Sequence, residues 1–157
     1  MNNTFVRSLA LTSNGTVFCG TQGGGIFFST NDGTSWTQIN NGLGDLTVFA
    51  LAATGVGDDE RIFAGTDSNG VYSLLISSLG GASPTWAAVG FGLPMTRVQA
   101  LEVSEDGTML YAGFNGSGVR RTSLLGSPNW EAINIGLDNP TVNDLHIAAG
   151  MIFAATD

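Results

Sequence analysis

The sequence predicts an all-β fold in which a unit of four short strands is repeated along a single domain. Glycine is abundant, with 23 residues in 157, and only 11% of the residues are charged, a composition typical of short strands joined by tight turns. Five landmarks recur in the same order three times, and no stretch shows the 3.6-residue period of a helix. The chain is also long enough to bury a sizeable core.

Each copy of the repeat begins with a valine that is followed three positions later by a leucine. An apolar strand, a glycine that opens a third strand, a tryptophan that begins a fourth, and a Gly-Leu pair come next. The landmarks are Val6, Val48, Val98 and Val142; Val17–Thr21, Ile62–Thr66, Leu110–Phe114 and Ile152–Thr156; Gly25, Gly70 and Gly118; Trp36, Trp86 and Trp130; and Gly42, Gly92 and Gly136. A four-stranded unit of about 40–50 residues matches one blade of a β-propeller. We therefore expect blades at about 5–43, 47–93 and 97–137, and a half blade at 141–157.

The order of strands within a blade follows from the turns and the apolar runs. Asn14-Gly15 and Asp106-Gly107 connect the first strand to the second, and both pairs favour a two-residue hairpin turn. The second strand is apolar at nearly every position, which predicts burial on both faces. We expect the three tryptophans to occupy equivalent buried positions. Trp36→Ala should then be severe, because truncation of a buried tryptophan costs about 3–5 kcal/mol.

The clearest outer hairpin runs from Ile26 to Leu43, and its turn is dense in residues that bond their own backbone. Its pattern is carried by Ser29, Asn31, Gly33, Ser35 and Trp36. These residues resemble the Asp-box (BNR) repeat, Ser-x-Asp-x-Gly-x-Thr-Trp, with Asn for Asp and Ser for Thr. The resemblance implies a propeller blade like those of sialidases, sortilin-like receptors, xyloglucanase-type glycosidases and photosystem assembly factors. In those families the box is structural and lies away from the active site.

The fourth copy contains only two strands and ends at Asp157. A propeller ring needs at least about four blades, so three and a half blades leave apolar faces and a strand edge in water. We expect either that the chain is part of a longer propeller or that copies of it associate. Two copies would supply about seven blades' worth of strands, a common propeller size, and this favours self-association.

Charge and hydropathy exclude several classes of partner. The formal net charge is −8, from thirteen acidic residues against five arginines, with no lysine. Such a surface repels nucleic acid and anionic lipid, so neither is an expected partner. No apolar run approaches the roughly 20 residues of a membrane span. The first residues also lack the basic and apolar segments of a signal peptide.

The isolated reactive side chains are best explained by structural or incidental roles. Cys19 is the single cysteine, and its alignment with alanines in the other copies predicts a small buried strand residue. His146 is the single histidine, so a metal site or a Ser–His dyad has little support. Asp58-Asp59-Glu60 offers the carboxylates that calcium prefers, but lacks the spacing of a calcium loop and predicts a solvated acidic hairpin. We therefore expect no metal site and no cofactor.

The most informative polar set follows the second strand of each copy: Gln22, Asp67, Asn115 and Asp157. In one register, they would form a ring around one mouth of the propeller channel, where such folds usually bind ligands. Thr66–Tyr72 also resembles the Thr-Asp-x-Gly-Gly-x-Tyr segment of xyloglucanase-type glycosidases, with Asn69 in place of the first Gly. The resemblance implies Asp67 as a candidate catalytic residue. An inverting hydrolase needs a second carboxylate about 6.5–9.5 Å away, for which Asp157 is the candidate. Three roles remain open for these four residues. In falling order of preference, they shape the turns, bind a ligand or take part in catalysis.

A sialidase has less support than a xyloglucanase. That family needs three arginines around a carboxylate. The arginines of this chain occupy unrelated positions of the repeat: Arg7, Arg61, Arg97, Arg120 and Arg121.

These observations favour a non-catalytic β-propeller module that serves as an interaction or structural scaffold, completed by self-assembly or by the remainder of a longer propeller. The alternative is a glycan-binding or xyloglucanase-like protein that uses the channel-mouth turns, so enzymatic activity stays open. The expected partners are a second copy, a glycan or another protein. The family resemblance alone favours a secreted or extracytoplasmic location.

Overall fold

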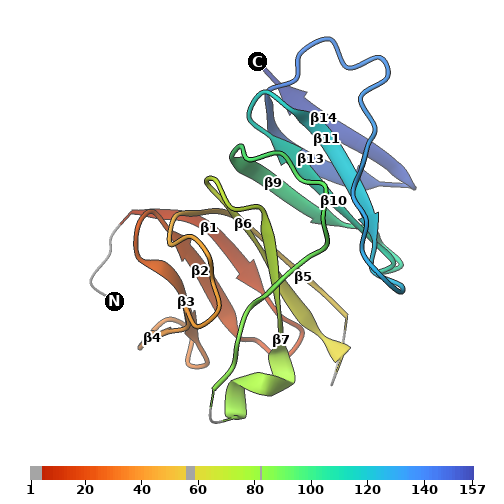
Figure 1. Ribbon diagram of the computed structural model, residues 1–157. Helices are drawn as coiled ribbons and strands as arrows, with labels where there is room; N and C mark the ends of the chain where they lie inside the picture. Colours follow the sequence, from red (N-terminus) through yellow and green to blue (C-terminus); the bar gives the residue numbers. More distant parts are fainter. Residues whose placement is uncertain (1–4, 56–58, 82) are drawn as a thin grey trace.

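The computed structural model describes residues 5–55, 59–81 and 83–157, and its regular secondary structure is almost entirely antiparallel strands (Figure 1). The first sheet contains β1 (Val6–Leu11), β2 (Val17–Thr21), β3 (Gly25–Ser29) and β4 (Thr37–Gln38). The second contains β5 (Val48–Thr54), β6 (Arg61–Thr66), β7 (Val71–Leu75) and β8 (Ala87–Ala88), with the 3-10 helix η2 (Ile76–Gly80) before β8. The third contains β9 (Val98–Val103), β10 (Met109–Phe114), β11 (Gly118–Ser123) and β12 (Glu131–Ala132), and the fourth contains only β13 (Val142–Ala148) and β14 (Met151–Thr156).

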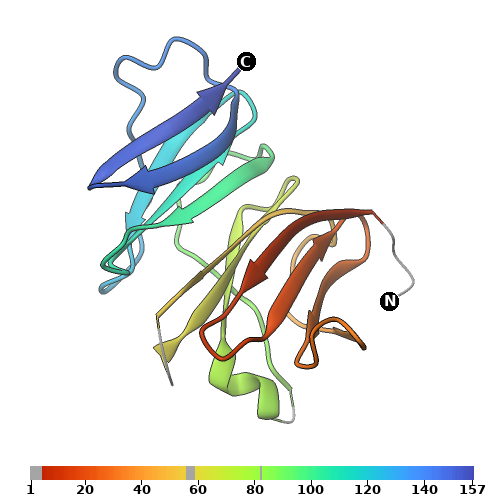
Figure 2. The same cartoon turned by 180° about the vertical axis from the view of Figure 1, so that it is seen from behind.

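The first strands of successive sheets lie side by side and form an inner row. β1 contacts β5, β5 contacts β9, and β9 contacts β13. The later strands of each sheet lie progressively outward, so the sheets fan out like blades, with β1 and β14 toward opposite ends of the array (Figures 1 and 2). None of the described sheets closes into a barrel. The predicted all-β fold of four-stranded blades in an incomplete ring is confirmed.

At each described contact between blades, a valine of one blade packs onto a glycine of the preceding blade; we call this contact the valine–glycine lock. A Cβ at Gly20 would lie 2.8 Å from Val48 Cγ1, and a Cβ at Gly65 would lie 2.5 Å from Val98 Cγ1. Gly113 repeats the arrangement with Val142 at 2.6 Å. All three valines are fully buried. Glycine is therefore needed on the second strand, because any side chain there would push the next blade away.

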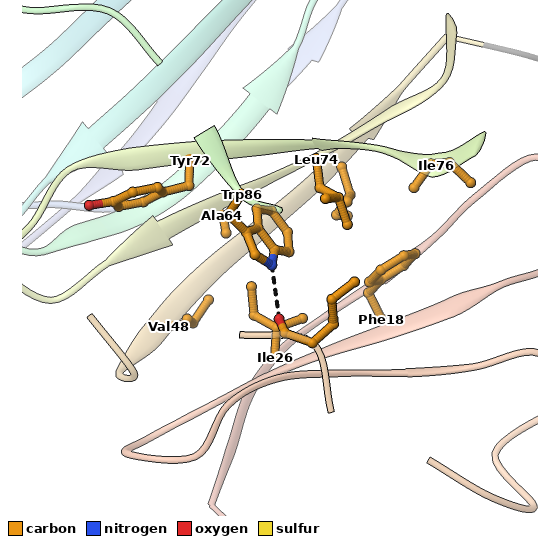
Figure 3. Packing of buried hydrophobic residues seen from close by; sticks show 10 residues of the cluster. Phe18, Ile26, Val48, Ala64, Tyr72, Leu74, Ile76 and Trp86 are labelled. Atoms are coloured by element: carbon orange, nitrogen blue, oxygen red, sulfur yellow. Dashed lines mark hydrogen bonds between the residues drawn. The ribbon is translucent and has the colours of Figure 1, made fainter. Parts of the chain in front are cut away.

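A tryptophan fills the outer part of each described contact between complete blades. Trp86 of the second blade is only 3% exposed, and its indole Nε1 donates a hydrogen bond to the Ile39 carbonyl of the first blade, 2.9 Å away (Figure 3). Trp130 of the third blade is 4% exposed and donates to the Val89 carbonyl of the second blade at 2.7 Å. The equivalence that the repeat predicts is therefore confirmed for these two residues.

Trp36 occupies the same register in the first blade but has different surroundings. It is only partly buried, and it lies over Gly33 in its own turn, where a Cβ would be 3.6 Å from the indole. The prediction of three equivalent tryptophans is thus wrong for Trp36. The physical reason is that no sheet precedes the first blade in the described part of the chain, so no neighbour covers this indole.

The turn before Trp36 is closed by side-chain hydrogen bonds. Ser29 Oγ accepts from the backbone N–H of Gly33 at 2.9 Å and donates to Asn31 Oδ1 at 2.9 Å. The same Asn31 oxygen accepts from the Ser35 N–H at 2.9 Å. Gly33 has a φ of 80°, a conformation that disfavours a side chain. The residues of the Asp-box pattern therefore bond to one another.

In the first and third blades, the hairpins between the first and second strands are longer than the two-residue turns that the sequence predicts. Thr12 N–H donates to the Thr16 carbonyl at 3.0 Å, which leaves Ser13, Asn14 and Gly15 in the first loop. In the third blade the Ser104 N–H donates to the Met109 carbonyl at 2.9 Å, which leaves residues 105–108 in the loop. In these two loops only Gly15 and Gly107 have positive φ, whereas a two-residue type I′ turn requires it at both central positions.

Candidate functional site

The turns that follow the second strands are held in the same way in the three complete blades. The Gln22 N–H donates to the Phe5 carbonyl at 2.9 Å, and the Asp67 N–H donates to the Thr47 carbonyl at 3.0 Å. The Asn115 N–H donates to the carbonyl of Arg97 at 3.0 Å. Each turn residue therefore lies beside the segment that enters the inner strand of its own blade.

The strongest interactions around these turns surround the ring of Phe49 on the inner strand β5. Arg97 of the third blade has its guanidinium carbon 4.0 Å from the centre of that ring, and its Nε donates to Asp67 Oδ1 at 2.7 Å. Arg7 of the first blade lies 5.6 Å from the same ring centre. Contacts between a cation and an aromatic face contribute about 0.5–1 kcal/mol at exposed sites. Three blades thus contribute to one cluster.

Amide side chains continue this line toward the last blade. Arg7 Nε donates to Gln22 Oε1 at 3.1 Å within the first blade. Gln99 Nε2 donates to Asn143 Oδ1 at 2.9 Å, from the third blade to the fourth. Asn143 Nδ2 donates to Asp157 Oδ1 at 2.7 Å. We call the whole set the polar row; it consists of Arg7, Gln22, Phe49, Asp67, Arg97, Gln99, Asn143 and Asp157.

Sequence reasoning found Gln22, Asp67 and Asp157 but missed the inner-strand half of the polar row. Four of those residues directly follow the first valine of each repeat, and Arg97 directly precedes that valine in the third repeat; the four are Arg7, Phe49, Gln99 and Asn143. This register position was the available signal. The fourth predicted residue, Asn115, is exposed, and no side-chain bond joins it to the row among the described residues.

The polar row offers donors and acceptors for a polar ligand, and its two carboxylates already have partners. Asp67 bonds Arg97, whereas Asp157 bonds Asn143 on the last blade. The side chains of Arg97 and Asp67 are 36% and 41% exposed, so both remain accessible to solvent. An arrangement of this kind can orient a ligand by hydrogen bonds.

The other reactive side chains lie elsewhere. Cys19 is 1% exposed on β2, and burial raises the pKa of its thiol, as expected for a structural residue. His146 is exposed on β13, with Nδ1 3.7 Å from Glu102 Oε1. Arg121 bonds Glu131 at 2.6 Å, and this hydrogen bond raises the pKa of the guanidinium. No group of three metal-ligating side chains occurs within the described residues.

The predicted solvated acidic hairpin is wrong at Glu60. Asp58 lies outside the described residues and Asp59 is exposed, but Glu60 is only 3% exposed. Its Oε1 accepts from the Ser13 N–H at 2.6 Å, and its Oε2 accepts from the Ser13 hydroxyl at 2.9 Å. Glu60 therefore ties a turn of the first blade to the second blade.

The two end sheets present a second candidate surface. Leu9 on β1 is 63% exposed, whereas its counterparts Leu101 and Leu145 are 7% and 5% exposed. At the other end, Phe153 on β14 is 51% exposed, whereas its counterpart Phe63 is 1% exposed. Positions that are core inside the array are thus open at its ends.

Comparison with known proteins supports the fold of this chain. No protein-family model matches the chain, and no curated protein matches it. A solved structure, the extracellular domain of a proposed one-component system from B. thetaiotaomicron, superposes with a TM-score of 0.75 at 13% sequence identity. The match covers 99% of this chain but 21% of the neighbour, so the chain spans about a fifth of that protein's length. The likeness establishes a propeller-like fold alone.

The extracellular setting of the neighbour is a property of that protein. At 13% identity the superposition carries over neither ligand nor partner to this chain. In the part of the chain that the structure describes, no helix has the length and hydropathy to cross a bilayer.

Proposed function

We propose that the chain is a non-catalytic propeller scaffold of the Asp-box type that acts by joining its open end sheets to further blade surface. The exposure of Phe153, against the burial of Phe63 at the same register, is the observation that supports it. Contiguous exposed apolar surface on a soluble fold marks an interaction site, because its transfer out of water stabilises the complex. A second copy of the chain is the proposed partner.

The valine–glycine lock suggests how two copies would meet. Val6 on β1 is the counterpart of the three buried valines and is 42% exposed. The position opposite it on the other end sheet is Ala155, where the internal contacts have glycine. A head-to-tail contact in the internal register would therefore be strained by one methyl group. Ala155→Gly should strengthen association, and an unchanged or weaker association would contradict this register.

Light scattering after size exclusion, over a range of protein concentrations, tests self-association. The expected mass exceeds the 16.2 kDa of one chain. Phe153→Ser should weaken association about tenfold or more, because burial of one phenylalanine contributes about 1.5–3 kcal/mol. Phe91→Ser is the matched control, since Phe91 is 86% exposed outside the end sheets. A mass of one chain at every concentration would contradict the proposal.

The alternative proposal is that the polar row binds a glycan. It is supported by the hydrogen-bonded pairs of amide, carboxylate and guanidinium groups beside the inner strands, because such donors and acceptors suit the hydroxyl groups of a sugar. A glycan array and a xyloglucan hydrolysis assay test it with Asp67→Asn. Asp138→Asn, an exposed acid outside the polar row, is the control. Binding lost with Asp67→Asn alone would favour the glycan proposal, and silence on every substrate would contradict it.

We also infer an extracytoplasmic location. Two observations support it: the resemblance of Ser29–Trp36 to the Asp-box repeat and the fold shared with an extracellular domain. Fractionation of the source cells tests it. Recovery of the protein with the cytoplasmic fraction alone would contradict the inference.

A further inference from the structure

The last blade has a cavity lined by apolar side chains at the position that an indole fills in the second and third blades. The cavity measures about 240 Å³ and is lined by Val119, Ile133, Ile135, Gly136, Leu137, Ile152 and Ala154. It lies between the third blade and the two-stranded sheet β13–β14, because its lining comes from both. We call it the indole socket.

The lining of the indole socket repeats, residue for residue, the surroundings of the two buried tryptophans. Ile26, Ile39, Leu43, Ile62 and Ala64 pack in the same cluster as Trp86. Val71, Val89, Leu93, Leu110 and Ala112 pack in the cluster of Trp130. In the repeat register, the counterparts are Val119, Ile133, Leu137, Ile152 and Ala154, all of which line the socket. The chain has three tryptophans, and none of them lies here.

The hydrogen-bond acceptor for an indole is defined by the same register. Trp86 donates to the carbonyl of Ile39, and Trp130 donates to the carbonyl of Val89. The counterpart of both acceptors is Ile133, which lines the socket. An indole is an apolar ring with one N–H donor, so the site matches it in both respects.

β14, the strand next to the socket, has an edge along which a further strand can pair. Among the strands that the structure describes, β14 pairs only with β13, whereas β2, β6 and β10 each pair on both edges. Thr21 and Thr66 donate their hydroxyls to the carbonyls of Gly25 and Gly70, which open the third strands, at 2.8 and 2.9 Å. Thr156 occupies this register on β14. A third strand could therefore dock on β14 through the ladder and this hydroxyl.

We propose that the indole socket and the β14 edge bind a tryptophan-bearing β-hairpin, which completes the fourth blade as its outer two strands. The occupant has the chemistry of this chain's own outer hairpins: a glycine, an apolar strand, a tight polar turn, then tryptophan and a short strand. This inference deepens the proposed scaffold function, since it names what one end of the array receives. Association by an added strand is a known mode of peptide recognition.

A synthetic peptide copy of residues 24–41 is the probe, because it contains the outer hairpin of the first blade with Trp36. Isothermal titration calorimetry into the full chain should give saturable binding with one site per chain. The same peptide with Trp36→Ala should bind about 100-fold more weakly, as expected for loss of a buried aromatic anchor. Absence of binding, or equal binding of both peptides, would overturn the proposal.

Two variants of the chain locate the binding. Ala154→Phe places a ring in the socket at an exposed position, so the chain should fold as before but lose the peptide. Ala132→Phe is the matched control, because Ala132 is exposed on β12, does not line the socket and lies outside the two end sheets. Circular dichroism should show the same melting behaviour for both variants. Loss of binding in both, or in neither, would overturn the site.

The light-scattering experiment separates this inference from the proposed function. Self-association without peptide binding would overturn the socket and leave the scaffold proposal intact. Peptide binding to a chain that stays monomeric would support the socket and count against self-association.

Discussion

Trp86 and Trp36 occupy the same place in the repeat, yet only one of them joins two blades. Trp86 is 3% exposed and bonds the preceding blade, whereas Trp36 is partly buried against its own turn. This difference shows that a single blade does not bury its own tryptophan and depends on the preceding blade to cover it. Its aromatic residue stabilises the contact between blades, so an end blade carries the same residue with less effect.

The comparison predicts that substitutions of the two tryptophans have unequal costs. Trp86→Ala should lower the free energy of unfolding by about 3–5 kcal/mol, because it leaves a cavity and an unpaired carbonyl. Trp36→Ala should cost about 1 kcal/mol, far less than the sequence predicts, since its indole remains partly in solvent. Urea denaturation of both variants measures the difference. Equal losses would remove the distinction between interior and end blades.

The bond between Glu60 and Ser13 is the next largest expected contribution. Glu60→Ala should cost about 1.5–3 kcal/mol, since it removes two hydrogen bonds to a buried charged group between the first two blades. Glu60→Gln keeps the shape and one acceptor, so it should recover part of the loss. Asp138→Ala, which removes an exposed acid, is the control for charge removal. If urea denaturation gives the same loss in free energy of unfolding for Glu60→Ala and for this control, the role of Glu60 is contradicted.

The turn before Trp36 should be less sensitive than the contacts between blades. Asn31→Ala removes the oxygen that accepts from Ser29 and Ser35, at a cost of about 0.5–1.5 kcal/mol. Thermal melting monitored by circular dichroism measures this effect. A loss as large as that of Trp86→Ala would show that the turn, and not the contact between blades, dominates stability.

The smallest predicted effect is the pH dependence of the β9–β10 turn. A hydrogen bond from Ser104, followed by bonds from Thr108, lowers the pKa of Asp106. Because the folded pKa lies below the unfolded value of about 3.9, this contribution is present above that value and is lost as the pH falls through the folded pKa. Asp106→Asn copies the neutral Asn14 of the first blade and should remove this part of the acid sensitivity. Melting temperatures below about pH 5 test it, and identical acid profiles for both proteins would contradict it.

The sequence predicted the blades because each landmark is local and recurs. Val48, Gly65 and Trp86 each have counterparts at a fixed order in the other copies, so the strands could be placed without knowledge of their neighbours. The turn at Gly15 was predicted too short, because a dipeptide motif does not reveal where the flanking strands stop pairing.

The features that sequence reasoning missed depend on contacts between copies. Glu60 looks like a surface acid until Ser13, 47 positions earlier, is brought against it. Arg7 and Arg97 occupy different positions of the repeat, and they meet at Phe49 only because their inner strands flank β5. Such contacts have no local signature, since they arise where one blade lies against the next.

Hydrogen exchange of the three indole N–H groups tests the account most directly, because each reports whether its blade is covered by a neighbour. We expect slow exchange of the indole N–H groups of Trp86 and Trp130, which are buried and hydrogen-bonded, and fast exchange of that of Trp36. The protein should be dilute enough to be monomeric. Equal exchange of all three groups would contradict the claim that an indole is protected only where the preceding blade covers it.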